Sequence, residues 1–465
     1  MTTSTSTRRP ASYWLDPEAG ASAVVGEPLR GEHRADVVVV GGGFTGLWTA
    51  LSLTDRDPSL RVHVVEAEVV GYGASGRNGG FVEPSLTHGL ANGRLHFPDE
   101  VDELARLGQE NFAGLLADAD RFGVSDAFER TGLLQVATAP WQLDDLAEDV
   151  EAHAALAEPH ELLDADGVRA EVDSPTYLGG LHLPEAGALV HPGQLVRALA
   201  SEARRRGVVI HEHSPVAGIA TTDTGVVAQG ADGHVLAERA VLATNAYSHR
   251  VLRRTSRHFV PVYDYVLLTE PLGAEQLARI GWKRRQGLAD SGNQFHYYRL
   301  TADDRILWGG YDAIYRFGNG VGPRFDHRRA TYDLLARQFR QTFPQLGDVR
   351  FDRWWGGPIA TTTRFTVTFG EAMGGRVVYA LGYTGLGVAA TRFAGRVLTD
   401  KLLDPDSSLL DLRFTSTQPF PFPPEPLRWA GVQLTRRAIA RADDRQGRRG
   451  PWLQLLDRFG IGFDS

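Results

Sequence analysis

The sequence predicts an α/β part, built like a Rossmann nucleotide-binding domain, joined to an α+β part with a mostly antiparallel β-sheet. Two observations predict this combination. Residues 35–66 have the pattern of a buried strand, a glycine turn, a helix and a second strand, which together make a βαβ unit. Residues 260–315 are rich in aromatic residues and contain strand-like runs, which indicates a second domain with its own sheet. The length of 465 residues allows two or three domains.

Composition limits the partners and sites that the chain can have. It contains no cysteine, which excludes disulfides and thiolate metal sites and agrees with a cytoplasmic location. The formal net charge is −8 and no basic stripe stands out, so we expect no nucleic-acid partner. No apolar run approaches the roughly 18–20 residues that span a bilayer, so we expect no membrane insertion. The histidines are scattered without the spacings of metal motifs, so we predict no metal site.

Residues 1–30 are predicted to form an N-terminal extension. Within it, Arg8-Arg9 is not followed by the apolar stretch that a twin-arginine export signal needs. We therefore interpret residues 1–10 as a disordered tail.

The first βαβ unit carries a glycine motif. Val37–Val40 is a continuous β-branched run, typical of a buried parallel strand, and Gly41-Gly-Gly-Phe-Thr-Gly46 after it matches G-x-G-x-x-G. Gly41 allows the tight turn, and Gly43 lets the backbone approach a pyrophosphate at the helix N-terminus. Gly46 lets the helix and strand pack closely, and Glu66 at the end of the next strand can accept hydrogen bonds from ribose hydroxyls.

A second glycine-rich loop favours FAD over NAD. Gly71-Tyr-Gly-Ala-Ser-Gly-Arg-Asn-Gly-Gly80 starts five residues after Glu66. Its many backbone N–H groups and small side chains can wrap a long cofactor, whereas a plain nicotinamide-binding fold has no need of such a loop. Arg77 and Asn78 are candidates to bind the pyrophosphate or the flavin ring, and a surface salt bridge is the alternative role of Arg77.

The rest of the chain is expected to contain further helices and strands. Residues 100–160 are mainly helical and charged, and Pro192 begins a helix with Gly207 as its C-cap. Later strands are expected at 208–210, 240–244, 262–269, 295–300, 305–310 and 377–381. A helix then runs to about Leu403, and the proline-rich segment 418–426 leads to two short amphipathic segments.

A third glycine cluster, Gly382-Tyr-Thr-Gly-Leu-Gly387, opens that last long helix. A helix N-terminus carries a positive dipole end, which stabilises a developing negative charge. The charge of a reduced flavin is the obvious candidate, and a simple packing turn is the alternative.

These motifs together resemble the D-amino acid oxidase family of FAD enzymes. The resemblance rests on Gly41–Gly46, Gly73–Gly80, Ala243-Thr-Asn-Ala-Tyr247 and Gly382–Gly387, and covers roughly residues 34–405. Within the family, which includes glycine and sarcosine oxidases, the γ-glutamylputrescine oxidase branch is the most similar. The resemblance implies an FAD-binding domain of discontinuous segments, at 31–96, 160–250 and 346–410. It implies a substrate domain at 97–159 and 251–345, with a C-terminal extension at 411–465.

The same resemblance and motifs give the expected contacts of a non-covalently bound FAD. These contacts are Gly41, Gly43, Phe44, Thr45, Gly46, Glu66, Ala74, Ser75, Arg77, Asn78, Gly79, Gly80, Val216, Ala243, Thr244, Gly385, Leu386, Gly387 and Val388.

The resemblance also implies oxidation of a C–N bond in a small amine or amino-acid derivative. A hydride leaves the carbon beside the nitrogen, and the resulting imine hydrolyses. The nitrogen must be neutral, and an amine with a pKa near 10 costs about 4 kcal/mol to deprotonate at pH 7. An apolar, aromatic pocket lowers that cost because it destabilises the ammonium form.

The aromatic strand Gln294–Arg299 is a candidate wall of this pocket. Alternation puts His296 and Tyr298 on one face of the strand, and we expect that face to look toward the flavin. His296, Tyr298 and Tyr383 are therefore the candidate catalytic residues, although an ordinary hydrogen-bonded sheet position is the alternative for His296. Further pocket candidates are Tyr311, Trp354 and Trp355.

Two departures from the family pattern bear on mechanism. Trp308 stands where the sarcosine oxidase relative has an oxygen-activating lysine, so the electron acceptor is either oxygen or another molecule. Relatives that oxidise free α-amino acids bind the substrate carboxylate with a basic side chain. The corresponding position in this chain is near Thr362, and Arg364 is the nearby basic residue that could serve instead. The sequence thus favours an amine substrate without a simple α-carboxylate.

Other functions stay open at this point. An FAD-dependent monooxygenase would be reduced by NAD(P)H without any amine. A flavin-binding protein without amine turnover would hold FAD tightly and oxidise nothing. A plain NAD dehydrogenase would be colourless after purification.

Overall fold

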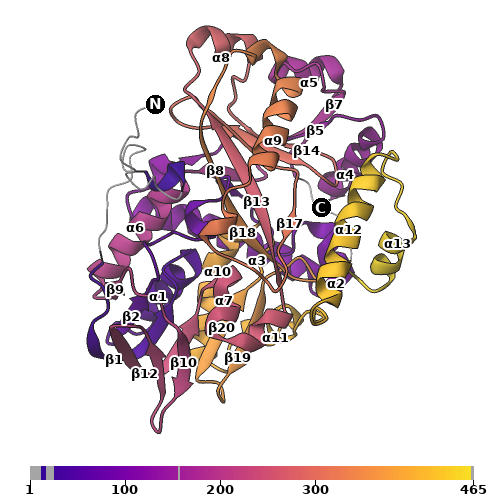
Figure 1. The fold of residues 1–465 in the computed structure, drawn as a ribbon. Coiled ribbons are helices and arrows are strands. Elements are labelled where there is room, and N and C mark those ends of the chain that lie inside the picture. Colours follow the sequence, from indigo (N-terminus) through magenta and orange to yellow (C-terminus); the bar gives the residue numbers. More distant parts are fainter. Residues whose placement is uncertain (1–11, 17–25, 156–157, 462–465) are drawn as a thin grey trace.

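The computed structural model describes residues 12–16, 26–155 and 158–461. The predicted tail at residues 1–10 lies outside these described residues. Of the two large sheets, Figure 1 shows the first in the lower part of the molecule and the second in the upper part. Within the described residues, no helix has the length and apolar character needed to cross a membrane.

The first sheet contains the predicted βαβ unit and has eight strands. Neighbours β9, β2, β1, β12 and β20 pair in parallel, while β11 pairs antiparallel with β10 and β12, and β19 with β20. The strands are β1 (Gly31–Val40), β2 (Val62–Val65), β9 (Val209–His211), β10 (Gly218–Thr221), β11 (Val226–Gln229), β12 (Gly233–Leu242), β19 (Thr368–Ala372) and β20 (Val377–Leu381).

Three helices bury their apolar sides against one face of this sheet, and a fourth packs on one of them. The three are α1 (Phe44–Arg56), α6 (Pro192–Arg205) and α10 (Gly387–Leu403), and the fourth, α3 (Val101–Arg121), packs on α10 in the same core. The predicted helix side at Leu47, Ala50, Leu51 and Leu53 is buried in this core. Because β1 and β2 are covered on both faces, Val37–Val40 form the continuous apolar run that the sequence showed.

The second sheet has nine strands and includes the strands predicted at 262–269, 295–300 and 305–310. It is a mixed sheet: β14 pairs in parallel with β5, and the other pairings are antiparallel, so the expected antiparallel sheet contains one parallel pairing. Its strands are β5 (Leu133–Ala137), β6 (Glu161–Leu163), β7 (Gly179–Leu183), β13 (Val260–Thr269), β14 (Gly287–Asp290), β15 (His296–Leu300), β16 (Ile306–Gly310), β17 (Ile314–Tyr315) and β18 (Phe351–Thr361).

Smaller elements complete the two halves. A three-stranded sheet joins β3 (Phe81–Val82), β8 (Ala188–Val190) and β4 (Phe128–Glu129). The other helices are α2 (Leu90–His96), α4 (Gln142–Ala155), α5 (Ala165–Glu171), α7 (Ser248–Val251), α8 (Ala274–Ile280), α9 (Arg329–Thr342), α11 (Arg413–Ser416), α12 (Leu427–Asp443) and α13 (Pro451–Arg458).

The predicted domain boundaries do not follow the sheets everywhere. β6, β7 and β18 fall in segments assigned to the FAD-binding domain, yet they belong to the nine-stranded sheet. Conversely, α3 falls in a segment assigned to the substrate domain, and it packs in the core of the first sheet. Hydrophobic periodicity shows that an element is buried, but not which sheet it joins or covers. The sequence pattern therefore could not show that these elements belong to the other half of the molecule.

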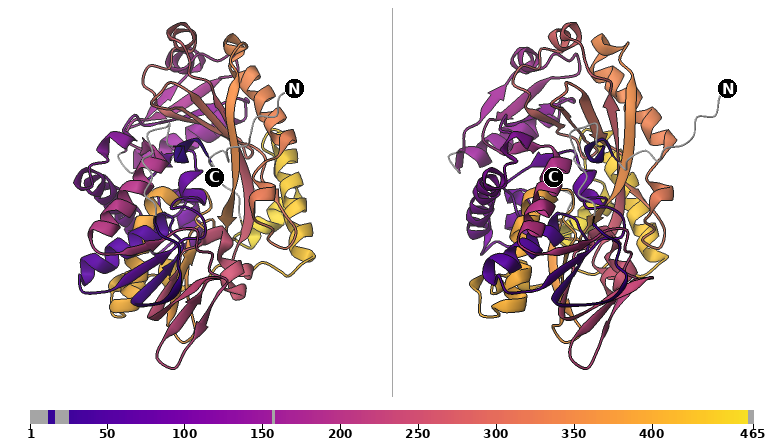
Figure 2. Two further views of the ribbon diagram at one scale, coloured as in Figure 1. Left: turned by 60° about the vertical axis from the view of Figure 1, so that its left-hand side comes forward. Right: turned by 90° about the vertical axis from the view of Figure 1, so that its left-hand side faces the viewer.

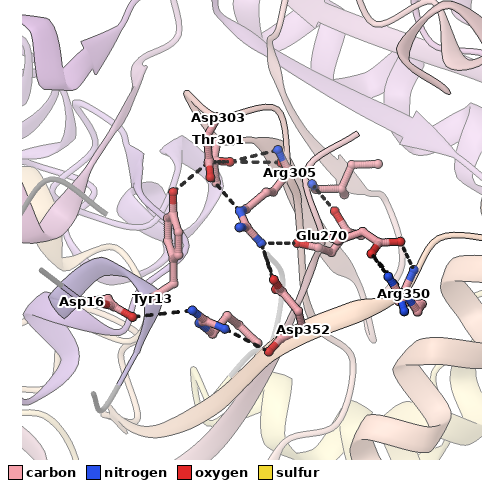
Figure 3. A network of polar contacts seen from close by, with 11 residues as sticks. Tyr13, Asp16, Glu270, Thr301, Asp303, Arg305, Arg350 and Asp352 are labelled. Carbon is pink, nitrogen blue, oxygen red and sulfur yellow. Dashed lines mark hydrogen bonds and ion pairs between the residues drawn. The ribbon is translucent and has the colours of Figure 1, made fainter. Parts of the chain in front are cut away.

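The N-terminal extension is part of the packed structure at residues 12–16. Trp14 is 1% exposed and donates a hydrogen bond from Nε1 to the carbonyl of Asn78 at 2.8 Å. Tyr13 donates to Asp303 at 2.7 Å, and Arg305 links Asp303 to Asp352, as Figure 3 shows. This segment therefore fastens the second glycine loop to the nine-stranded sheet.

The C-terminal extension lies along the second sheet. Helix α12 packs beside β17, and both views of Figure 2 place the yellow C-terminal helices next to the orange α9. Asp443 at the end of α12 accepts hydrogen bonds from the backbone N–H groups of Asn293 and Gln294 at 3.2 and 2.9 Å. The extension thus holds the turn that precedes β15.

Candidate active site

One cavity of about 1710 Å³ connects the three glycine loops. This exceeds the roughly 300–1,000 Å³ of an ordinary small-molecule pocket, so it has room for a dinucleotide and a substrate together. Of the expected FAD contacts, all but Gly46 and Gly80 line it. The lining contacts are Gly41, Gly43, Phe44, Thr45, Glu66, Ala74, Ser75, Arg77, Asn78, Gly79, Val216, Ala243, Thr244, Gly385, Leu386, Gly387 and Val388.

The first glycine loop lies where β1 ends and α1 begins. Gly41 has φ +113°, a conformation that side chains rarely adopt. A Cβ on Gly46 would lie 1.9 Å from the carbonyl oxygen of Gly41, so this glycine allows the helix to pack on the turn. Glu66 lines the cavity, and one of its carboxylate oxygens accepts a hydrogen bond from the Gly42 N–H at 2.7 Å. Burial raises the pKa of Glu66, although backbone N–H groups oppose that shift.

The second glycine loop meets the N-terminus of α1. The Ser75 hydroxyl accepts a hydrogen bond from the Phe44 N–H at 2.8 Å. Asn78 holds the shape of the loop, since its amide donates to the Ala74 carbonyl at 2.9 Å and its side-chain oxygen accepts from the Gly80 N–H at 2.8 Å. The loop thus places a hydroxyl at the helix end where a pyrophosphate binds in dinucleotide folds.

Arg77 forms a buried ion pair inside the molecule. Its guanidinium donates to Asp326 at 2.7 Å, to the Gly356 carbonyl at 2.9 Å and to the Tyr72 carbonyl at 2.8 Å. The salt bridge that was the alternative role of Arg77 is therefore present, and it is buried rather than on the surface. It joins the second glycine loop to the nine-stranded sheet.

The third glycine loop is tied to the first by one hydrogen bond. The hydroxyls of Tyr383 and Thr45 lie 2.8 Å apart, and both residues line the cavity. Gly387 is the first residue of α10, so the N-termini of α1 and α10 open on the same cavity. A Cβ added to Gly73 or Gly385 would meet no atom of the chain within 4 Å, so these glycines border open space.

The aromatic strand β15 turns the opposite face to the cavity from the one expected. Phe295 and Tyr297 line the cavity, and the Tyr297 hydroxyl donates to Asp264 on β13. Burial raises the pKa of the Asp264 carboxyl to about 6. The face with His296 and Tyr298, which was expected to look toward the flavin, does not border the cavity.

His296 and Tyr298 lie on the other side of the nine-stranded sheet. Tyr298 is 0% exposed in an apolar core, where its hydroxyl contacts that of Tyr177 at 2.7 Å. His296 contacts Asp290 at 2.5 Å and stacks on Trp308. Both faces of β15 carry aromatic residues and both are covered, so alternation alone could not show which face borders the cavity.

Four other residues singled out in the sequence lie away from the cavity lining. Trp308 packs in the same core as Tyr298 and does not line the cavity. Arg364 donates to Thr417 and Gln418, and therefore fastens the C-terminal extension instead of binding a substrate carboxylate. Trp354 is 43% exposed and Tyr311 stacks on His296, while Trp355 does line the cavity.

Glu83 is a cavity residue that the sequence interpretation missed. It follows β3 directly, and no hydrogen bond or ion pair to another described residue is present at its carboxyl group. Burial raises the pKa of Glu83 from its ordinary value of 4.5 to about 7. An acidic residue just after the second glycine loop was the signal available in the sequence.

One part of the cavity lining is formed by acidic residues of a helix and by the C-terminal extension. Asp144, Asp145, Glu148 and Asp149 of α4 line it, together with the turn at residues 446–449. Burial first, and the neighbouring carboxylates second, raise the pKa of Asp145. The turn also brings Arg448 and Arg449 to the lining, so this part of the cavity carries charges of both signs.

Comparison with known proteins identifies the family. A family model described as FAD dependent oxidoreductase, DAO, matches residues 36–401. The chain belongs to this family. It is 34% identical over 401 residues to the gamma-glutamylputrescine oxidoreductase of Escherichia coli (strain K12), across 85% of this chain and 90% of that protein.

Solved structures share the fold of this DAO-family enzyme. Glycine oxidase from Geobacillus kaustophilus has a TM-score of 0.68 at 20% identity, covering 83% of this chain and 99% of that one. L-proline dehydrogenase from P. horikoshii has a TM-score of 0.65 at 19% identity, covering 83% of this chain and 97% of that one. The family membership makes this chain an FAD-dependent oxidoreductase, and its glycine-lined cavity with two helix N-termini fits that cofactor.

Proposed function

We propose that this enzyme oxidises the C–N bond of a small amine or amino-acid derivative. When FAD is bound, it supplies a two-electron oxidant that takes a hydride from the carbon beside the nitrogen, and the imine product then hydrolyses. The names of two relatives, gamma-glutamylputrescine oxidoreductase and glycine oxidase, each specify a compound with an amino group. The proposal extends that chemistry to this chain.

The carboxyl group of Glu83, which has no partner among the described residues, is the observation that carries the proposal. A carboxyl group bordering a cavity without a protein partner is costly unless a ligand of opposite charge or a proton joins it. A substrate ammonium supplies that charge and stabilises the ionised carboxylate. Since the pKa of Glu83 is about 7, the carboxylate can also accept the ammonium proton near neutral pH.

The aromatic wall beside Glu83 supports the same chemistry. Phe81 and Tyr297 contact each other edge to face, with ring centroids 5.8 Å apart, and both line the cavity. Such a wall excludes water and lowers the cost of making the amine neutral, which is otherwise about 4 kcal/mol at pH 7. We propose that Tyr297 and Trp355, rather than Tyr298, border the substrate.

We propose that the lining residues of the three glycine loops, with Val216, Ala243 and Thr244, hold FAD without a covalent bond. Gly46 and Gly80 act indirectly, because a Cβ on either would collide with the backbone that shapes the loops. Tyr383 keeps the first and third loops together through Thr45. Its hydroxyl is therefore assigned a positioning role in this proposal.

The positions of the lysines bear on which electron acceptor the enzyme uses. Neither lysine of the chain, Lys283 or Lys401, lines the cavity. A lysine ammonium at the flavin would stabilise the negative charge of superoxide, and neither lysine of this chain supplies one. We propose that reduced enzyme reacts slowly with oxygen and passes electrons to another acceptor.

An anaerobic screen of the FAD-loaded enzyme tests the function. Monoamines, diamines, acylated diamines, glycine, sarcosine and proline are mixed with the enzyme, and loss of the flavin absorbance is followed. We expect bleaching by an amine that carries no simple α-carboxylate. Bleaching by NADPH without an amine would favour the monooxygenase alternative, and failure of every amine would refute the proposal.

A further inference from the structure

Three histidines far apart in the sequence meet at one edge of the eight-stranded sheet. His33, His63 and His211 come from β1, β2 and β9, which are consecutive neighbours in that sheet. Their candidate ligand nitrogens all lie within 4.8 Å of one another. None of the three lines the FAD cavity, so the cluster is separate from the active site.

The spacing of two of these nitrogens matches that of ligands on one metal ion. His63 Nδ1 and His211 Nε2 are 3.2 Å apart. Two nitrogens that each lie about 2.0–2.1 Å from a tetrahedral zinc ion are separated by about 3.3 Å. His33 is only half-buried, so its ring has room to rotate toward the other two.

The second ring nitrogens of two of these histidines have carbonyl partners. His211 Nδ1 lies 3.3 Å from the Glu27 carbonyl, and His33 Nε2 lies 3.0 Å from the Arg30 carbonyl. A carbonyl only accepts, so these nitrogens carry the protons, which leaves His211 Nε2 and His33 Nδ1 with free lone pairs. Carbonyl partners of this kind are what orient imidazole ligands in metal sites.

The proton shared between His63 and His211 does not prevent a cation from binding. His63 Nδ1 faces the lone pair of His211 Nε2 and therefore carries a proton when no cation is present. A cation between them requires only that this proton move to Nε2 of the same ring.

We propose that His33, His63 and His211 bind a divalent cation of the zinc type, with three imidazole ligands and one position left for water. Neutral imidazoles without a carboxylate suit Zn²⁺, Ni²⁺ or Cu²⁺ and exclude Mg²⁺ and Ca²⁺, which prefer oxygen ligands. The cation would fasten the edge strand β9 to β2 and β1. The site is independent of the amine-oxidation proposal.

Metal titration of the FAD-loaded full chain, prepared without a histidine tag and treated with EDTA, tests the site. We expect calorimetry with ZnCl₂ to give one ion per chain, and Zn²⁺ to raise the melting temperature. His63→Asn and His33→Asn should each weaken binding at least tenfold. His234→Asn, a half-buried histidine on neighbouring β12, should leave binding unchanged.

Two results would overturn the proposal. One is the absence of stoichiometric Zn²⁺ binding by the unmodified enzyme, and the other is unchanged affinity in His33→Asn. FAD content and circular dichroism check that each variant is folded. If His63→Asn fails that check, the difference spectrum of Co²⁺-loaded unmodified enzyme decides, since imidazole-bound Co²⁺ absorbs in the visible range and aquated Co²⁺ barely does.

Discussion

At the level of single residues, Glu83 links the ionisation of the cavity to activity. We expect Glu83→Gln to lower kcat/KM for amines at least tenfold at pH 8 and to remove the limb of the pH profile near pH 7, because the carboxylate no longer accepts the ammonium proton. Glu185→Gln, at an exposed acid lining the same cavity, is the matched control. An unaltered pH profile in Glu83→Gln would exclude Glu83 from proton transfer.

The same substitution has a predictable effect on stability. The folded-state pKa of Glu83 is raised from 4.5 to about 7, so the folded chain keeps this proton longer than the unfolded chain does. The free energy of unfolding therefore falls as pH rises between these values, by at most about 3 kcal/mol. We expect Glu83→Gln to melt at a higher temperature than the unmodified protein at pH 8 and at a similar temperature at pH 4. Thermal melts at the two pH values check this.

Neighbouring tyrosines on β15 should give opposite phenotypes. Tyr297→Phe removes a hydroxyl bound to Asp264 at the cavity, so we expect altered turnover with normal FAD content. Tyr298→Phe removes buried contacts with Tyr177 and Asp290, so we expect a loss of about 1 kcal/mol of stability with turnover retained. Steady-state kinetics and thermal melts of both variants measure this. If Tyr298→Phe altered turnover and Tyr297→Phe did not, the His296 and Tyr298 face predicted from the sequence would be the one at the substrate.

At the level of elements, local patterns predicted the cofactor half well. Gly41 and Gly385 have positive φ angles, which glycine adopts readily. Each lies in a turn between a strand and a helix, so the glycine pattern predicts both the shape and the location of these turns. The substrate half depends on which side of a doubly covered sheet meets the cavity, and that is set by contacts distant in sequence. His33, His63 and His211 illustrate the same limit, because only strand order brings them together.

The first glycine loop offers a direct test of the cofactor site. Gly43→Leu should abolish FAD binding, because a side chain there meets Ser75 and then enters the cavity. Gly431→Ala, in helix α12 with open space around it, is the control and should keep FAD. Absorbance of the purified proteins measures flavin content, and a yellow Gly43→Leu protein would contradict the assignment of this loop.

The C-terminal extension should influence the substrate through β15. Asp443→Ala frees the backbone of Asn293 and Gln294, whose turn borders the cavity. We expect KM for the amine to rise severalfold while FAD content stays constant. Asp444→Ala, at the adjacent exposed acid, is the control, and equal KM values in the two variants would show that this turn does not need the extension.

At the level of the whole molecule, the buried pair of Arg77 and Asp326 joins the cofactor loop to the substrate sheet. Asp326→Ala leaves a buried guanidinium without its carboxylate, so we expect a loss of about 3–5 kcal/mol of stability. Asp333→Ala breaks an exposed pair with Arg329 and should change stability little. Calorimetry checks both, and a small effect at Asp326 would mean that the two halves are held mainly by apolar contact.

The hydrogen bond between Thr45 and Tyr383 brings the N-termini of α1 and α10 to the same cavity. Each helix end carries about half a positive charge, so small inorganic anions should compete for this place before the cofactor arrives. Apoprotein kept in phosphate buffer should accordingly take up FAD more slowly than apoprotein kept in an uncharged organic buffer. The choice of buffer thus becomes part of any reconstitution protocol for this enzyme.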